Sequence, residues 1–251
     1  MGQWNRMERV LNKYVPGPVD MLITEGTMLS REGEIGHTLV KSEQELGERA
    51  EELFQKHKYN FVLVSSTNLD SIMEFYHSTP EGMHFVCDLY QARILITAMR
   101  DMERKGKFPE YQPSKKHPVV RVLGKGDSRW AELQAIGNTM QNPLYFKAAR
   151  EEELERGGQI IYSMWTGYLK GEHADKALIR FIGGRPVEFL HTSGHVYVET
   201  IAKLIETVDP KWIIPMHTER AEEFSAIPEF VRWKSQVKVL KDGRPLDLDT
   251  L

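Results

Sequence analysis

The chain has 251 residues, of which 33 are Lys or Arg and 36 are Asp or Glu, so its formal net charge is −3 with neutral histidines. This balance excludes a global basic field that holds nucleic acid without specificity, so any nucleic-acid site must be local. The hydrophobic fraction of 41% and the charged fraction of 27% are those of globular proteins and exclude a disordered or collagen-like chain. The length fits one large or two small domains.

The single cysteine, Cys87, excludes an intramolecular disulfide and indicates a reducing compartment, for which the cytoplasm is the default. Residues 1–18 are polar and contain no signal-peptide core, and no apolar run approaches about 18 residues. We therefore expect a cytoplasmic protein with no membrane partner.

From residue 19 onward, short apolar runs typical of buried strands alternate with stretches of helical periodicity. Strands are predicted at residues 19–24, 60–65, 83–88, 119–123, 159–165, 187–193 and 211–217, and a strand with a turn is predicted at 237–248. Helices are predicted at residues 42–57, 65–77, 89–106, 148–158, 174–182, 196–208 and 218–227. Ser42 followed by Glu45 is the pattern of a capping box at the start of the first of these helices.

Strands alternating with helices predict an α/β fold with a largely parallel sheet and flanking helices on both faces. In such sheets ligands bind where strands end and helices begin. Residues 107–142 carry three prolines and are less regular, so they are predicted to form a variable insertion or lid.

Three predicted strand ends are rich in polar residues: TEGT at residues 24–27, HTSGH at 191–195 and PMHTE at 215–219. Ser193 and Thr218 can be explained as helix caps. Two histidines, His195 and His217, and one carboxylate, Glu25, nevertheless all occur at such ends. Imidazoles and a carboxylate that meet at one sheet edge are what a zinc site or a general acid/base pair requires.

Taken together, these motifs resemble those of the β-CASP branch of metallo-β-lactamase-fold hydrolases, which contains RNase J and the mRNA 3′-end processing endonuclease. HTSGH and PMHTE resemble the last two signature motifs of that branch, and VDMLITEGT at residues 19–27 resembles the acidic motif that opens the β-CASP segment. The resemblance covers nearly the whole chain. It implies a metallo-β-lactamase-fold segment at residues 1–40, a β-CASP-like α/β domain at 41–185, and a second metallo-β-lactamase-fold segment with the two histidine motifs at 186–251.

The resemblance also implies a role for each residue at these positions. Glu25 stands where the family uses a carboxylate to orient the histidine of the next motif. His195 stands at that histidine, which contacts the scissile phosphate and protonates the leaving oxygen, and Ser193 would donate to the phosphate beside it. His217 stands at a zinc ligand, so zinc is the expected cofactor.

Two further segments follow predicted strands. Ser66, Thr67 and Asn68 offer hydroxyls and backbone N–H groups that can bind a phosphate backbone, although an ordinary helix N-cap explains the same residues. The aromatic side chains of IYSMWTGY at residues 161–168 can stack nucleic-acid bases, but aromatic residues near strand ends more often fill the core.

The sequence departs from the family at its metal site. The family also uses an HxHxDH motif, a further histidine and an aspartate, all before the acidic motif, and this sequence has no counterpart of them. Because Glu25 lies so close to Met1, we expect the sequence to correspond to the C-terminal portion of a β-CASP hydrolase. A binuclear zinc site needs several protein ligands, so the chain alone should bind zinc weakly and hydrolyse little.

The first interpretation is therefore the C-terminal part of a zinc-dependent phosphodiester hydrolase, with RNA as its substrate by resemblance to RNase J and with no activity in the absence of the metal-binding half. Its partner would be a complementary N-terminal polypeptide or a second copy of the chain, because an apolar face would otherwise be exposed. The alternative is a non-catalytic module that binds nucleic acid or protein. An unrelated α/β protein with accidental motif matches is a third interpretation.

Overall fold

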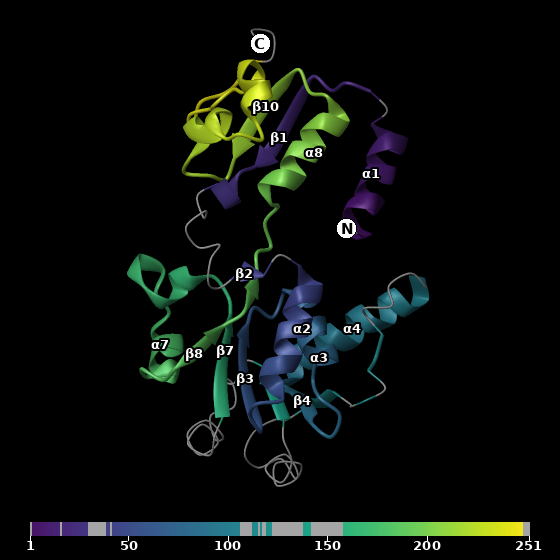
Figure 1. The fold of residues 1–251 in the computed structure, drawn as a ribbon, viewed down its shortest axis with the longest axis vertical. Helices are drawn as coiled ribbons and strands as arrows, with labels where there is room; N and C mark the ends of the chain where they lie inside the picture. Colours follow the sequence, from purple (N-terminus) through teal and green to yellow (C-terminus); the bar gives the residue numbers. More distant parts are fainter. Residues whose placement is uncertain are drawn as a thin grey trace. The chain divides into compact units, whose positions relative to one another are not determined.

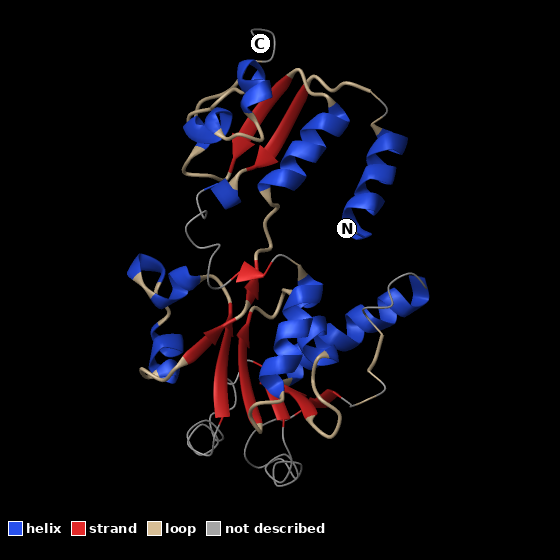
Figure 2. Ribbon diagram, viewed as in Figure 1, coloured by secondary structure: helices blue, strands red, loops and turns tan. Residues whose placement is uncertain are grey.

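The computed structural model describes residues 2–15, 17–29, 39–40, 42–105, 112–114, 116, 119–121, 138–141 and 158–247. The chain divides into two compact units: unit 1 consists of Met1–Ile35 and Gly194–Leu251, and unit 2 consists of Gly36–Ser193. Unit 2 is therefore one continuous segment inserted into the sequence of unit 1. The strand pairs of the described residues are parallel and are accompanied by helices, which confirms the predicted α/β class (Figures 1 and 2).

Unit 2 is built on a parallel six-stranded sheet in the order β5-β4-β6-β3-β7-β8. Its strands are β3 (Tyr59–Val64), β4 (His84–Cys87), β5 (Val119–Arg121), β6 (Asn138–Gln141), β7 (Gly158–Ser163) and β8 (Val187–Phe189). Every residue of β3 is buried, as expected for a short apolar strand that is covered on both faces.

Helices cover both faces of this sheet (Figure 1). They are α2 (Glu43–Phe54), α3 (Leu69–His77), α4 (Leu89–Lys105) and α7 (Lys176–Ile182). Val62 and Val64 of β3 belong to the core cluster that contains buried residues of α2, α3 and α4. Phe61 and Leu63 belong to the cluster that contains Leu178 and Phe181 of α7. Successive residues of β3 belong to opposite clusters because side chains along a strand point alternately to the two faces of the sheet.

The predicted cap at the start of α2 is confirmed. The Ser42 hydroxyl accepts the N–H of Glu45 at 3.1 Å, and Leu46, Ala50 and Phe54 are the buried apolar residues of the helix. Their spacing of four residues places them on one face of the helix.

The two ends of unit 2 lie beside each other. Strand β2 (Leu39–Val40) near its start pairs in parallel with strand β9 (His191–Thr192) near its end. Thr192 donates to Glu43 Oε1 at 2.5 Å, and Ser71 donates to Glu43 Oε2 at 3.0 Å. Burial raises the pKa of the Glu43 carboxyl despite these two hydrogen bonds. The carboxylate thus links α2 and α3 to the last strand of the unit.

Unit 1 contains a two-stranded parallel sheet of β1 (Met21–Glu25) and β10 (Trp212–Met216). Its helices are α1 (Gly2–Tyr14) and α8 (Val198–Val208), and the 3-10 helices η6 (Ala221–Ala226) and η7 (Val231–Gln236) follow β10. Ile205 of α8 and Ile213 of β10 are fully buried in one cluster with Phe224 and Phe230, whose rings stack at 4.2 Å.

One face of the small sheet carries exposed apolar side chains. Among the described residues β1 pairs only with β10, and Ile23 at its centre is 57% exposed. Met216 at the end of β10 is 52% exposed. Parallel strands are normally covered on both faces, so these side chains form an apolar surface of unit 1 that the described chain leaves open.

Several predicted elements need correction. The strand predicted at residues 187–193 is two strands, β8 and β9. The N–H of Leu190 donates to the Tyr162 carbonyl of β7, and the chain then changes partner and pairs with β2. The helix predicted at 218–227 is the 3-10 helix η6, since Ile227 precedes a proline and takes an extended conformation.

Of the strand and turn predicted at residues 237–248, the strand is wrong and the turn is confirmed at Asp242 and Gly243. Val237 makes one isolated bridge to Ile213, and Gly243 then takes a positive φ of 72° beside Pro245, which ends the extended path. Helix α1 was not predicted, and the predicted helix at 148–158 lies outside the described residues apart from Gly158, which begins β7. No helix in the described ranges is long and apolar enough to cross a membrane.

Candidate metal centre

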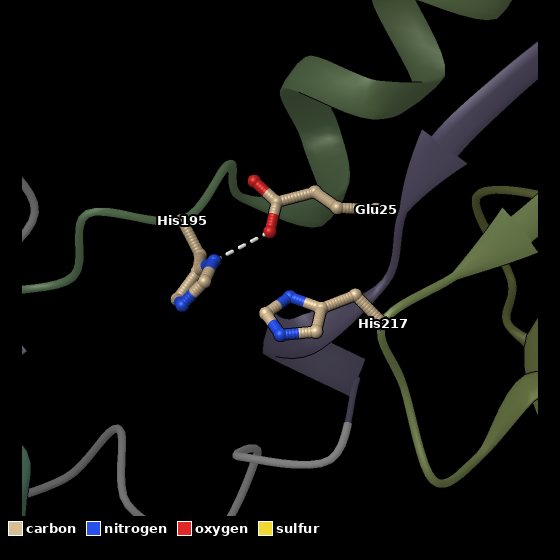
Figure 3. Close-up of side chains that lie close together, drawn as sticks. All are labelled: Glu25, His195 and His217. Carbon is tan, nitrogen blue, oxygen red and sulfur yellow. Dashed lines mark hydrogen bonds and ion pairs between the residues drawn. The ribbon is translucent and has the colours of Figure 1, made fainter.

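Three side chains of unit 1 converge at the carboxyl end of its small sheet. Glu25 is the last residue of β1 and is paired with Met216, so His217 directly follows the neighbouring strand. His195 precedes α8 and points toward the same place (Figure 3). One ligand atom from each of the three residues lies within 4.8 Å of the others, and this is the only such group in the described part of the chain.

The Glu25 carboxylate holds His195 in place. His195 Nδ1 lies 2.6 Å from Glu25 Oε2, and the backbone N–H of Val196 donates to Glu25 Oε1 at 2.8 Å. Partial burial alone would raise the pKa of the Glu25 carboxyl, but the hydrogen bonds from Val196, His195 and Thr27 outweigh it and lower this pKa below its ordinary value. Glu25 is therefore a carboxylate at neutral pH, and it fixes Nδ1 as the protonated nitrogen of His195.

Thr27 links His217 to the same carboxylate. Its hydroxyl oxygen lies 3.1 Å from His217 Nδ1 and 3.1 Å from Glu25 Oε2. The hydroxyl oxygen also lies 3.0 Å from the His217 carbonyl oxygen. Because its one hydrogen is donated to Glu25 Oε2 or to that carbonyl, Thr27 accepts a hydrogen bond from His217 Nδ1–H. The lone pair of His217 is then on Nε2, the arrangement typical of a metal-ligating histidine whose other nitrogen donates to a neighbour.

Thr27 received no role in the sequence-based prediction, although it belongs to the TEGT segment. The contact of Thr27 with Glu25 could have been predicted from the sequence, because a hydroxyl residue two positions after a strand-end carboxylate can reach back to it. What the sequence could not reveal is the contact with His217, since the two residues are separated by 190 positions.

The backbone around the site is constrained. His217 takes a positive φ of 55°, a conformation that non-glycine residues adopt rarely and that clusters at functional sites. Gly26 donates to the Met216 carbonyl at 2.9 Å and so extends the contact of the two strands beyond Glu25. A Cβ at Gly26 would lie 3.0 Å from side-chain carbons of Leu29 and Thr218, so the close approach favours glycine.

The donor set fits a divalent metal such as zinc. Imidazole nitrogen and carboxylate oxygen are ordinary zinc ligands at about 2.0–2.2 Å, so two ligand atoms of one ion lie at most about 4.4 Å apart. The three side chains, within 4.8 Å of each other, need to close by less than about 1 Å to share an ion. His217 is exposed and Glu25 and His195 are half-buried, so the site is accessible from solvent.

The other predicted site residues belong to unit 2. Ser66, Thr67 and Asn68 follow β3 at the start of α3, and the side chain of Asn68 makes no capping hydrogen bond. Ser193 is the last residue of unit 2, directly before the boundary with unit 1. Their roles in substrate binding stay predictions.

Comparisons with known proteins add no assignment. No family model matches the chain, and no curated protein matches it significantly. The sequence motifs and the geometry of Glu25, His195 and His217 are therefore what indicate a function for this chain.

Proposed function

We propose that this chain provides part of the active site of a zinc-dependent hydrolase of the β-CASP type that cleaves phosphodiesters, with RNA as its substrate. The observation that carries the proposal is the placement of a Glu25–His195 pair beside His217 in one accessible group. These three residue types at these motif positions are the ones that the resemblance to β-CASP hydrolases assigns to catalysis and metal binding.

Each side chain has a distinct task in the proposed reaction. His217 holds the metal through Nε2, while its Nδ1 is oriented by Thr27. His195 has Nδ1 engaged by Glu25, so Nε2 is the nitrogen that contacts the scissile phosphate and delivers a proton to the leaving oxygen. The carboxylate of Glu25 orients the His195 ring for this step. Bound zinc supplies a Lewis acid and an activated water.

The remaining metal ligands come, in this proposal, from a complementary polypeptide. In this proposal Glu25 is engaged by His195 Nδ1, and His195 Nε2 contacts the phosphate, so His217 is the one residue of the group that binds the ion. A catalytic zinc takes three protein ligands. The exposed apolar side chains of Ile23 and Met216 lie on the strands that lead directly into the site. A partner that covers them would deliver its own ligands next to His217.

The first test measures zinc affinity and stoichiometry for the chain and for its His217→Ala variant by competition with a chromophoric chelator. The proposal expects weak binding that His217→Ala abolishes. His173→Ala is the matched control, because His173 is an exposed histidine of unit 2. Equal zinc binding by the chain and by His217→Ala would contradict the role of His217.

The second test adds a polypeptide that carries the HxHxDH half of a β-CASP hydrolase and follows cleavage of a single-stranded RNA. We expect cleavage only with both polypeptides present, and its loss with His195→Ala or His217→Ala. Cleavage that survives both substitutions would refute the assignment. Binding of RNA without any cleavage would favour the alternative of a non-catalytic module.

A further inference from the structure

The segment after β7 forms an exposed group of aromatic rings in unit 2. The rings of Trp165 and Tyr168 meet edge to face with centroids 5.4 Å apart, and the centroid of the His173 ring also lies 5.4 Å from that of Trp165. Tyr168 is 43% exposed and the His173 side chain is 60% exposed. Tyr162, by contrast, is fully buried, so the aromatic residues of this segment divide between core and surface.

The group is held rigidly. The buried Tyr162 hydroxyl donates to the Trp165 carbonyl at 2.7 Å. A Cβ at Gly167 would lie 2.4 Å from the Trp165 ring, so the indole packs directly against this glycine and no larger residue fits there. The N–H of Asp175 donates to the Tyr168 carbonyl at 2.8 Å and closes the segment, which consists of the 3-10 helices η4 (Thr166–Leu169) and η5 (Gly171–His173).

The group lies at the carboxyl edge of the six-stranded sheet. Strand β7 neighbours β3, with Ser163 paired to Val64, so both strands end at the same level. The chain then continues from β3 into α3 on one face and from β7 toward α7 on the other (Figure 1). This is a topological switch point, where open α/β sheets bind their ligands.

The arrangement favours a flat ligand over a cation. The Tyr168 and His173 rings each pack against Trp165 with centroids 5.4 Å apart, so neither ring is separated from the indole by the gap that an aromatic cage needs for a quaternary ammonium group. The surrounding charges are mixed: Lys170 and Lys176 are exposed in the same segment, and so are Glu172 and Asp175. Stacking on an outer ring face, rather than net charge, is therefore the interaction that the group offers.

We propose that Trp165 and Tyr168 form a stacking platform for an unpaired base of single-stranded nucleic acid. The site lies in unit 2, uses none of Glu25, His195 and His217, and needs no metal. It goes beyond the proposed hydrolase, because it holds a base whether or not the strand is cleaved.

The test measures fluorescence anisotropy of a labelled ten-nucleotide oligoadenylate with the full chain in EDTA, beside an abasic strand of the same length. The platform predicts weaker binding of the abasic strand. Tyr168→Ala should weaken binding of the oligoadenylate by about fivefold to about 150-fold, the range for one lost stacked base, whereas Tyr168→Phe retains it. Tyr90→Ala is the matched control, since Tyr90 is 63% exposed on α4, and it should bind as the unaltered chain does.

Three results would overturn the platform: no binding of oligoadenylate, equal binding of the abasic strand, or binding unchanged in Tyr168→Ala and Trp165→Ala with native circular dichroism. Binding of choline or trimethyllysine that Tyr168→Ala removes, without any oligoadenylate binding, would show a cation site instead. The His217→Ala variant should bind oligoadenylate normally, so failure of the zinc site and failure of the platform are distinguishable.

Discussion

His195 Nδ1 lies 2.6 Å from Glu25 Oε2, although the two residues are separated by 170 positions in the sequence. All of unit 2 is inserted between them. The contact therefore forms only when the two segments of unit 1 come together, and it connects the assembly of that unit to the chemistry of its site.

Removal of the Glu25 carboxylate should destabilise the chain. Glu25→Ala leaves the Val196 N–H and His195 Nδ1 without their acceptor, which should lower the free energy of unfolding by about 1–3 kcal/mol in urea denaturation. Glu25→Gln keeps one acceptor oxygen, so its free energy of unfolding should fall by less than that of Glu25→Ala. An Ala variant as stable as the unaltered chain would show that water replaces the carboxylate at no cost.

The same carboxylate should make stability depend on pH. The pKa of Glu25 in the folded chain lies below its ordinary value of 4.5, so its stabilising effect is present above that value. The effect is lost as the pH falls through the lowered folded-state pKa, because the unfolded chain binds the proton first. Urea denaturation between about pH 3 and pH 6 should show this loss, and Glu25→Gln should remove it. An identical pH profile for the variant would assign the loss to other carboxyls.

The Thr27 hydroxyl should matter for metal affinity more than for folding. Thr27→Val removes the link between His217 Nδ1 and Glu25 while keeping the shape of the side chain. Loss of such a supporting hydrogen bond typically weakens metal binding by about 10-fold to about 100-fold. Thr27→Ser keeps the hydroxyl and should bind zinc like the unaltered chain in chelator competition. Equal affinity of the Val and Ser variants would exclude this link.

Gly26→Ala should destabilise unit 1. The added methyl group would lie 3.0 Å from Leu29 and Thr218 carbons beside the site, and overpacking of this kind costs about 1–3 kcal/mol. Gly17→Ala is the matched control, because nothing lies within 4 Å of its Cβ. Thermal unfolding of both variants checks the difference. Equal unfolding temperatures of the two variants would contradict this prediction, because they would show that Leu29 and Thr218 move aside for the added methyl group at no cost.

Glu43 should give a pH dependence of opposite sign to that of Glu25. Burial and the nearby Asp70 raise the pKa of Glu43 above 4.5, so its charged form is less favoured in the folded chain than in the unfolded one. Its stabilising contribution is full below the unfolded pKa and is lost as the pH rises through the raised folded-state pKa. Glu43→Gln should remove this decline in urea denaturation measured from pH 4 to pH 8. A decline that persists in the variant would contradict the assignment.

The elements of unit 2 were largely predictable because local pattern and tertiary environment agree there. The apolar run at residues 60–65 matches the fully buried β3, and Ser42 caps α2 as its spacing with Glu45 indicates. The hydrophobic pattern of the sequence fails to predict an element where the pairing with neighbouring strands determines its bounds. The break between β8 and β9 depends on a switch of partner strand, from β7 to β2, which a single segment does not encode.

The candidate site was predictable in its members but not in its connections. Parallel strands bring their carboxyl ends together, so the proximity of Glu25 and His217 follows from the order of β1 and β10. The roles of Thr27 and of the Val196 N–H depend on exact backbone paths, including the positive φ of His217, and these emerge only from the folded chain.

The pairing of β2 with β9 brings the first and last strands of unit 2 side by side in the same direction. An inserted segment whose two ends meet needs no long connection to its host, so the sequence of unit 1 could lose or gain such a segment without a change in its own strand pairing. Residues 36–193 are accordingly a natural module for excision, for exchange between proteins and for expression on its own.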